Sequence, residues 1–115
     1  MGFELRVARG AASDFRLIYR HLNESYRSFG ETSADARLRA TQRVLEIRMR
    51  AHALTIHPFR GQRDDDVSPG LRHVTMNRAI YYFTIDEPRA LVTLVGVFLD
   101  GQEHRRRMLL RLLSE

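Results

Sequence analysis

Apolar and polar positions alternate over residues 3–7, at the start of the chain, and this period of two predicts a half-buried β-strand. From residue 15 to residue 26 the apolar positions change to helical spacing and form one face of an amphipathic helix. Ser13 is expected at the N-cap or in the first turn of this helix, with Asp14 near the positive end of the helix dipole. Gly30 is well placed to end the helix in a left-handed conformation.

A second amphipathic helix follows, and Ser33 is its expected N-cap. Its apolar stripe repeats at intervals of four, three, four and three residues: Ala40, Val44, Ile47, Ala51 and Leu54. Pro58 is expected to end the helix, because proline cannot continue the backbone hydrogen bonding. The short link between the two patterns predicts an antiparallel helical hairpin whose apolar faces need a sheet to cover them.

The next pattern is that of two strands joined by a tight turn at Met76-Asn77, with Arg72 and Arg78 flanking the turn near the strand ends. The second of these strands, which runs to residue 86, is apolar on both faces, with Tyr82 among its aromatic residues. A strand of this kind is expected at the centre of a sheet. Residues 91–99 are almost continuously apolar and rich in β-branched side chains, so they predict another central strand.

The last segment, residues 103–113, has a helical pattern with an exposed triplet of arginines, Arg105, Arg106 and Arg107. Its apolar positions are Met108, Leu109, Leu112 and Leu113. Taken together, the elements predict an α+β fold over residues 1–115 as a single domain. It consists of an N-terminal strand, a two-helix hairpin packed on a small antiparallel β-meander, and a short C-terminal helix.

Composition restricts the chemistry that the chain can perform. A hydrophobic content of 43% is enough for a core, and there is no cysteine to form a disulfide, a nucleophile or a thiolate ligand. The net charge of +5 is carried by arginine alone, because the sequence contains no lysine. This basic charge favours nucleic acid or an acidic protein as a partner. No apolar run is long enough to span a membrane, so we expect a cytoplasmic protein.

Residues 58–70 have the composition of a loop and contain three successive aspartates, Asp64, Asp65 and Asp66. We interpret them as a solvated charge run rather than a Mg²⁺ or Ca²⁺ site, because no spaced glycine–glutamate pattern accompanies them. The five histidines lie far apart and lack metal-ligand spacing: His21, His52, His57, His73 and His104. We therefore expect no metal, no cofactor and no catalytic residue.

Four short motifs, in this order, resemble the RelE/ParE toxin superfamily along nearly the whole chain. Residues 11–18 are similar to the opening of the first helix of that family, Ala-x-x-Asp-Leu-x-x-Ile. Residues 54–61 are similar to the end of its second helix, Leu-x-x-x-Pro-x-x-Gly. Residues 70–72 resemble the start of its next strand, and residues 81–86 resemble its aromatic strand before a turn.

The resemblance implies a type II toxin–antitoxin toxin and leaves its target open. ParE-like members poison DNA gyrase without established catalytic residues, and their partner is a ParD-like, ribbon-helix-helix antitoxin with a disordered C-terminal segment. RelE-like members are ribosome-dependent mRNA endonucleases with basic residues at the end of the last strand. Here Leu99 and Asp100 stand at that place, although His104 and Arg105 follow soon after. The sequence therefore favours the ParE-like branch, in which direct contact with nucleic acid is not expected.

Two alternatives remain: the RelE-like nuclease, and a non-toxic binding domain that has kept only the fold. In each case an acidic and apolar partner would meet basic and apolar groups of this chain. The candidate contact residues are Arg72, Arg78, Tyr82, Arg105, Arg106, Arg107, Leu109, Leu112 and Leu113. Arg72 has a second interpretation, as a surface ion pair with one of the three loop aspartates.

Overall fold

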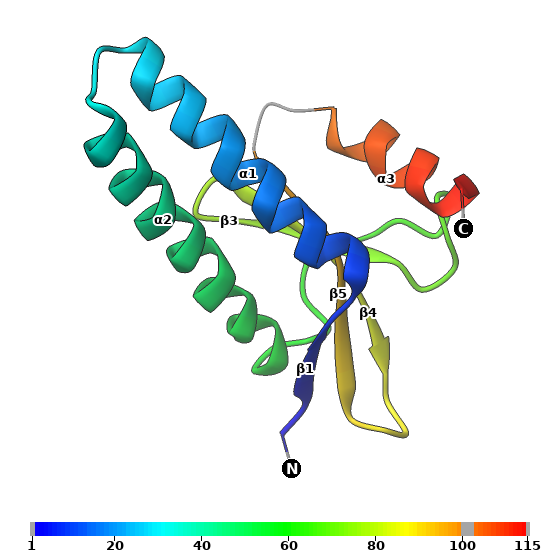
Figure 1. Cartoon of the computed structure of the whole chain (residues 1–115). Coiled ribbons are helices and arrows are strands. Elements are labelled where there is room, and N and C mark those ends of the chain that lie inside the picture. Colours follow the sequence, from blue (N-terminus) through cyan, green and yellow to red (C-terminus); the bar gives the residue numbers. More distant parts are fainter. Residues whose placement is uncertain (1, 100–102, 115) are drawn as a thin grey trace.

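A helical hairpin packs on one face of a five-stranded sheet, and a third helix packs on the other face (Figure 1). The structure is a computed structural model, which describes residues 2–99 and 103–114. The elements are β1 (Glu4–Val7), α1 (Arg9–Ser28), α2 (Ser33–Arg50), the 3₁₀ helix η1 (Ala51–Thr55), β2 (Gln62–Arg63), β3 (Arg72–Met76), β4 (Ala79–Asp86), β5 (Leu91–Leu99) and α3 (His104–Ser114). The α+β class and the order of elements predicted from the sequence are thereby confirmed.

The sheet has the order β1-β5-β4-β3-β2, so β4 and β5 are interior strands, as predicted. Strands β2 to β5 pair antiparallel, whereas β1 pairs parallel with β5, from Glu4 opposite Leu91 onward. The register between β4 and β5 shifts at Tyr82/Phe83. The meander β3-β4-β5 is therefore extended by β2 at one edge and by β1 at the other. The first strand of the chain pairs with the last.

The start of α1 differs from the prediction. The helix begins at Arg9, four residues before Ser13, and its N-cap is Ala8, which makes no side-chain capping bond. The backbone N–H of Ala8 instead donates to the carbonyl of Leu94 at 2.9 Å, so that β1 leads directly into the helix. At the other end, Gly30 has φ of +97°, which agrees with the predicted left-handed termination.

The ends of α2 also differ from the prediction. Thr32, rather than Ser33, is the N-cap, and its hydroxyl accepts the backbone N–H of Asp35 at 3.1 Å. The α-helix ends at Arg50 and the chain tightens into η1 well before Pro58. The predicted apolar stripe continues from α2 into η1. All of its residues are buried except for Val44, which is half-buried.

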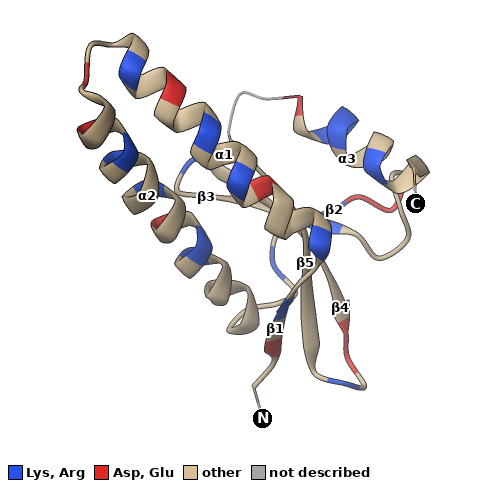
Figure 2. Ribbon diagram, viewed as in Figure 1, with Lys and Arg blue, Asp and Glu red and all other residues tan. Residues whose placement is uncertain are grey.

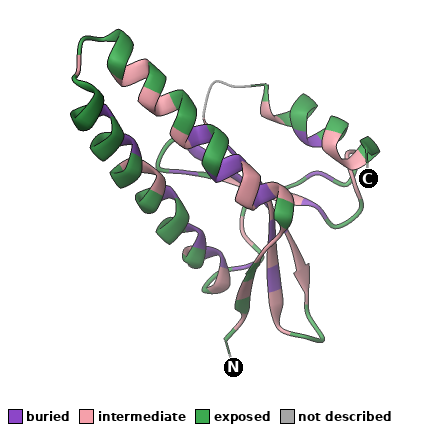
Figure 3. Ribbon diagram, in the orientation of Figure 1, coloured by how far each residue is buried: buried purple, intermediate pink, exposed green. Residues whose placement is uncertain are grey.

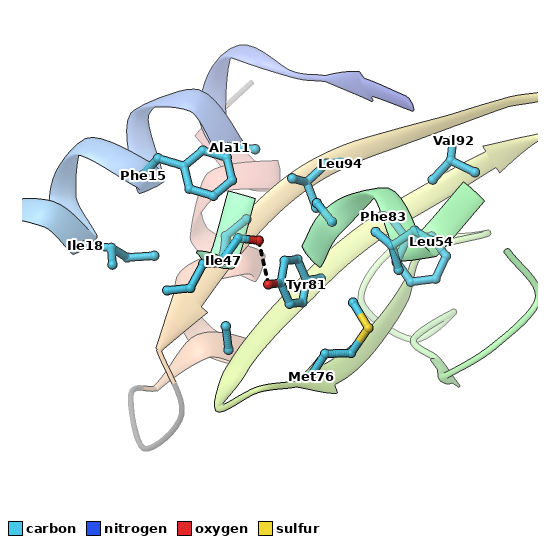
Figure 4. Packing of buried hydrophobic residues seen from close by; sticks show 13 residues of the cluster. Ala11, Phe15, Ile18, Ile47, Leu54, Met76, Tyr81, Phe83, Val92 and Leu94 are labelled. Atoms are coloured by element: carbon cyan, nitrogen blue, oxygen red, sulfur yellow. Dashed lines mark hydrogen bonds between the residues drawn. The ribbon is translucent and has the colours of Figure 1, made fainter. Parts of the chain in front are cut away.

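Alternation along β4 divides the core between the two faces of the sheet. Tyr81 and Phe83 face the hairpin, together with Phe15, Ile47 and Leu54 (Figure 4). The Tyr81 hydroxyl donates to the carbonyl of Ile47 at 2.7 Å, which satisfies its only buried polar group. Figure 3 shows the buried positions gathered along the faces where the helices meet the sheet.

A smaller cluster occupies the opposite face of the sheet, under α3. Its buried members are Leu71, Ile80, Tyr82, Phe98 and Met108. Helix α3 contributes one buried side chain, Met108, and the half-buried Leu112 to this cluster. In the part of the chain that the structure describes, no helix has the length and apolar character of a membrane span.

Candidate functional site

Five polar side chains meet beneath the first turn of α3. The Tyr82 hydroxyl lies 2.9 Å from Nδ1 of His104, so a residue of β4 is joined to the start of α3. His73, on the neighbouring strand β3, has its ring centroid 5.2 Å from that of Tyr82 and 5.8 Å from that of His104. Asp64 and Arg105 complete this group, which we call the polar cluster.

Asp64 is the centre of the polar cluster. Its side chain has no exposed area, and its carboxylate accepts from Nδ1 of His73 at 2.5 Å and from Arg105 at 2.9 Å. Its backbone N–H donates to the carbonyl of Leu71 at 2.8 Å, which fixes the loop beside β3. Interpreting Asp64 as part of a solvated charge run is therefore wrong, because two charged or polar partners compensate its burial.

The other two aspartates of the loop remain exposed. The N–H of Gly70 and the guanidinium of Arg63 bind the Asp65 carboxylate and lower its pKa. Asp66 pairs with Arg105 and, with Asp64, raises the pKa of that guanidinium. The three consecutive residues thus have different partners, which the sequence alone did not indicate.

Burial, and next the charge of Asp64, raise the pKa of Tyr82 to about 12. The phenol is therefore protonated at neutral pH and can donate to His104. Because a carboxylate can only accept, Nδ1 of His73 carries the proton in its contact with Asp64. A carboxylate that orients a histidine in this way is the arrangement of a general base, and Arg105 adds a cation.

The polar cluster is closed in this conformation. Tyr82 and Asp64 have no exposed area, and only 16% of the His73 side chain is exposed. Tyr82, a predicted contact residue, therefore cannot touch a partner here. The cluster joins three elements, the loop before β3, the sheet and α3, and so it holds the start of α3 against the sheet.

A second polar contact holds the end of α3. Arg111 donates to both carboxylate oxygens of Asp14 on α1, at 2.6 and 2.9 Å, and to the carbonyl of Val95 at 2.9 Å. Asp14 also accepts the backbone N–H of Val97 at 2.9 Å. Asp14 is thus buried and paired, and it lies in the second turn of α1 rather than at the start of the helix as predicted. A Cβ at Gly96 would lie 2.9 Å from the Met108 sulfur, so a glycine there lets α3 approach β5 closely.

The outward side of α3 is apolar and basic. Leu109, Leu110 and Leu113 are 40, 52 and 73% exposed, whereas Leu112 packs partly against the smaller core cluster. The predicted arginine triplet is divided among different partners. Arg105 belongs to the polar cluster, Arg106 lies 3.6 Å from Glu103, and Arg107 lies over the ring of Phe98.

The structure separates Arg72 from Arg78. The turn between β3 and β4 is formed by Asn77 and Arg78, with φ of +50° and +64°, so Arg78 lies within the turn and not beside it. Arg72 lies at the opposite end of β3, where it donates to the carbonyls of Phe59 and Arg60 at 3.3 and 3.4 Å. No ion pair joins Arg72 to a loop aspartate within the described ranges.

A groove of about 530 Å³ lies between α1 and α2. Its lining is mainly apolar, with arginines at its edges: Ala12, Phe15, Arg16, Tyr19, Arg20, Asn23, Thr41, Val44, Leu45 and Arg48. Leu45 is 52% exposed at the edge of the groove. The side-chain oxygen of Asn23 is buried there, and no group in the described part of the chain donates a hydrogen bond to it.

A second groove, of about 420 Å³, lies between α1 and α3. It is lined by Asp14, Leu17, Ile18, His21, Val97, Phe98, Arg107, Leu110, Arg111 and Ser114. Figure 2 shows arginines along α1, α2 and α3, the three helices that border the two grooves.

Sequence reasoning found Tyr82 and Arg105 and missed their neighbours in the polar cluster. Asp64, His73 and His104 lie on a loop, a strand and a helix, so no spacing rule connects them. The pairing of His73 with Tyr82 follows from the hairpin register, which depends on the turn being at Asn77-Arg78 and not at Met76-Asn77 as predicted. The prediction that concerns Asp100 lies outside the described residues.

No protein-family model and no curated protein matches the sequence. Solved structures match the fold. One is a chain from the chromosomal ParDE TA system of P. aeruginosa, with a TM-score of 0.65 and 18% identity over 86% of this chain and 97% of that chain. Another is a chain from the RelBE2 toxin–antitoxin complex of Mycobacterium tuberculosis, with a TM-score of 0.50 and 12% identity over 86% of this chain and 99% of that chain.

Proposed function

The chain has a RelE/ParE-like toxin fold, and from this premise we propose that it is the toxin component of a type II toxin–antitoxin pair. In the proposed pair, a co-encoded antitoxin of the ParD type, with a ribbon-helix-helix domain and a disordered C-terminal segment, neutralises the toxin by binding its helices.

The observation that carries the proposal is the groove between α1 and α2. An apolar floor with an exposed leucine, Leu45, fits the apolar face of an amphipathic segment, and Arg16, Arg20 and Arg48 fit its carboxylates. Exposed Leu109 and Leu113, with Arg106 and Arg107 beside them, extend the candidate contact surface on α3.

For the target we propose DNA gyrase, as the ParE-like resemblance implies. The closed state of the polar cluster supports inhibition by binding, because Tyr82 and Asp64 have no exposed area and only 16% of the His73 side chain is exposed. Arg78 supports the same reading, since its turn exposes a cation at the end of a hairpin. The localisation that this function requires is cytoplasmic.

The experiment is inducible expression of the chain with and without the protein encoded beside it. Expression alone should arrest growth, and co-expression should restore it. Purified protein should then inhibit supercoiling by gyrase and leave ribosome-bound mRNA intact. Harmless expression of a soluble, monodisperse protein would contradict the toxin proposal, whereas arrest without loss of supercoiling would contradict the target.

The polar cluster favours one second candidate, a ribonuclease of the RelE type. A histidine oriented by a buried aspartate, a second histidine and an arginine are the groups that cleavage next to a 2′-hydroxyl needs. The candidate requires that α3 move away from Tyr82 and His73. Codon-positioned mRNA cleavage that is lost in His73→Ala and retained in His57→Ala, a loop histidine away from the cluster, would establish this candidate in place of gyrase.

A further inference from the structure

Helix α1 is shared by the two grooves described above. Its residues Phe15, Tyr19 and Asn23 line the groove toward α2, and Leu17, Ile18 and His21 line the groove toward α3. The two sets alternate along the same turns of the helix, so the grooves lie side by side at the same level of α1. The two grooves are therefore separated only by the width of α1.

Both grooves combine apolar edges with positive charge. In the groove toward α3, Leu17 and Leu110 are 48 and 52% exposed, close to the 52% of Leu45 in the other groove. Within residues 2–99 and 103–114, no carboxylate pairs with Arg107 or with His21. The one acid in this lining, Asp14, is already bound by Arg111.

The surface of α1 between the grooves continues this character. Arg16 and Arg20 are exposed on the α2 side, and Leu17 follows on the α3 side. The guanidinium of Arg16 donates only to the hydroxyl of Ser13, at 3.0 Å, among the bonds of the described chain. Both arginines are therefore available to carboxylates that cross the helix.

We propose that the groove between α1 and α3 is a second docking site for the same antitoxin segment that occupies the groove between α1 and α2, and that this segment straddles α1. The inference rests on the proposed function and adds to it the path of the partner. The segment places an apolar side chain in each groove and acidic residues over Arg16, Arg20 and Arg107.

The dimensions agree with this path. An α-helix with its side chains is about 10–12 Å across. An extended chain advances about 3.3–3.6 Å per residue, so roughly three to four residues cross α1 between the two apolar anchors. Because the crossing makes the second contact intramolecular, the two weak sites act as one strong one.

Charge decides against a second copy of this chain as the occupant. The chain carries a net charge of +5, and both grooves are edged by arginine. Self-association through them would bring like charges together, whereas an acidic segment meets complementary charge.

The test measures binding of the purified protein encoded beside this chain to the unmodified toxin and to four variants. Leu45→Glu places a negative charge at the groove toward α2, and Leu110→Glu places one at the groove toward α3. Leu38→Glu is the matched control, because Leu38 is 58% exposed on α2 and lines neither groove. Leu45 and Leu110 are also replaced together.

We expect each groove variant to weaken binding at least tenfold, the control to stay within twofold, and the double variant to lose more than either single one. Melting temperatures of all versions should agree, because the three leucines are exposed. As a second measurement, the bound partner should slow amide exchange in residues 107–114 as well as in α1.

The outcomes separate the two proposals. If the neighbouring protein does not bind the unmodified chain, the proposed function fails. If Leu45→Glu weakens binding and Leu110→Glu leaves it unchanged, with no protection of α3, only the straddling path is overturned. A concentration-dependent dimer that Leu110→Glu abolishes would assign the groove to a second copy and also overturn it.

Discussion

Arg111 binds both carboxylate oxygens of Asp14, at 2.6 and 2.9 Å, although the two residues are 97 positions apart in the sequence. Asp14 lies in the second turn of α1, and Arg111 lies in the last part of α3, with β5 between them. The pair therefore joins α1 to α3 across β5, where the N–H of Val97 and the carbonyl of Val95 are further hydrogen-bond partners.

Replacing Asp14 with alanine should destabilise the protein strongly. The change removes the carboxylate that accepts from the half-buried Arg111 guanidinium and from the N–H of Val97, which we expect to lower the free energy of unfolding by about 2–4 kcal/mol. Urea denaturation measures it. Glu24→Ala, at an exposed acid of the same helix, is the control and should remain within about 0.5 kcal/mol of wild type. Equal losses in both variants would show that the pair has no special role.

Replacing Arg78 with glycine should stabilise the fold. Arg78 has φ of +64° in the hairpin turn, a conformation that glycine adopts without strain. We expect a gain of about 0.5–1 kcal/mol in the free energy of unfolding, together with weaker inhibition of the target if this arginine makes contact there. Arg78→Ala controls for the lost charge, because it keeps the strain. A variant that is more stable and fully toxic would remove Arg78 from the contact surface.

Stability should fall in alkaline solution as the two buried tyrosines ionise. Burial raises the pKa of Tyr81 and of Tyr82 to about 12, above the value of about 10 in an unfolded chain. Since the folded state holds these protons more tightly, its stability is complete below pH 10 and declines between about pH 10 and 12. Each tyrosine contributes up to about 1.4 kcal/mol per pH unit. Urea denaturation at about pH 9 and pH 11 measures the decline, which Tyr82→Phe should reduce.

Loss of Arg105 should loosen the start of α3 without unfolding the sheet. Arg105 joins the helix to Asp64 and Asp66, whereas its neighbour Arg106 lies near Glu103 of the same segment. Amide exchange in residues 105–108 should therefore be faster in Arg105→Ala and unchanged in Arg106→Ala. A higher salt concentration should also make amide exchange in residues 105–108 faster, because salt screens the exposed part of these ion pairs. Identical exchange in the two variants would contradict the role given to the polar cluster.

The sequence was a good guide wherever one local pattern determined the structure. Alternation in β4 correctly separated Tyr81 from Tyr82, because successive side chains of a strand must face opposite sides. The stripe of α2 and the left-handed Gly30 follow from local geometry in the same way. The predicted N-cap of α2, Ser33, is one residue away from the observed N-cap, Thr32, because the two adjacent hydroxyl side chains can both cap a helix.

Long-range contacts could not be predicted in this way. Asp14 follows the helix start that the sequence predicts, and no local pattern indicates its partner, Arg111, at the far end of the chain. The sequence predicts the same exposed position for Asp64 and its two neighbours. In the structure, a backbone hydrogen bond holds Asp64 beside β3, where its side chain points toward His73. The contacts of Asp14 with Arg111 and of Asp64 with Arg105 depend on how α3 packs, and the pattern of α3 alone gives no information about where it packs.

The parallel pairing of β1 with β5 has a consequence for how this protein is made. Glu4 can reach its position opposite Leu91 only after β5 has left the ribosome, on the order of ten seconds after β1 at about 5–20 residues per second. During that interval the first strand has no place in the sheet, and such late, non-local closure slows folding. The edge of the sheet on which α1 depends for its orientation is thus completed near the end of synthesis, so a shortened chain that lacks β5 would leave its own first strand unpaired.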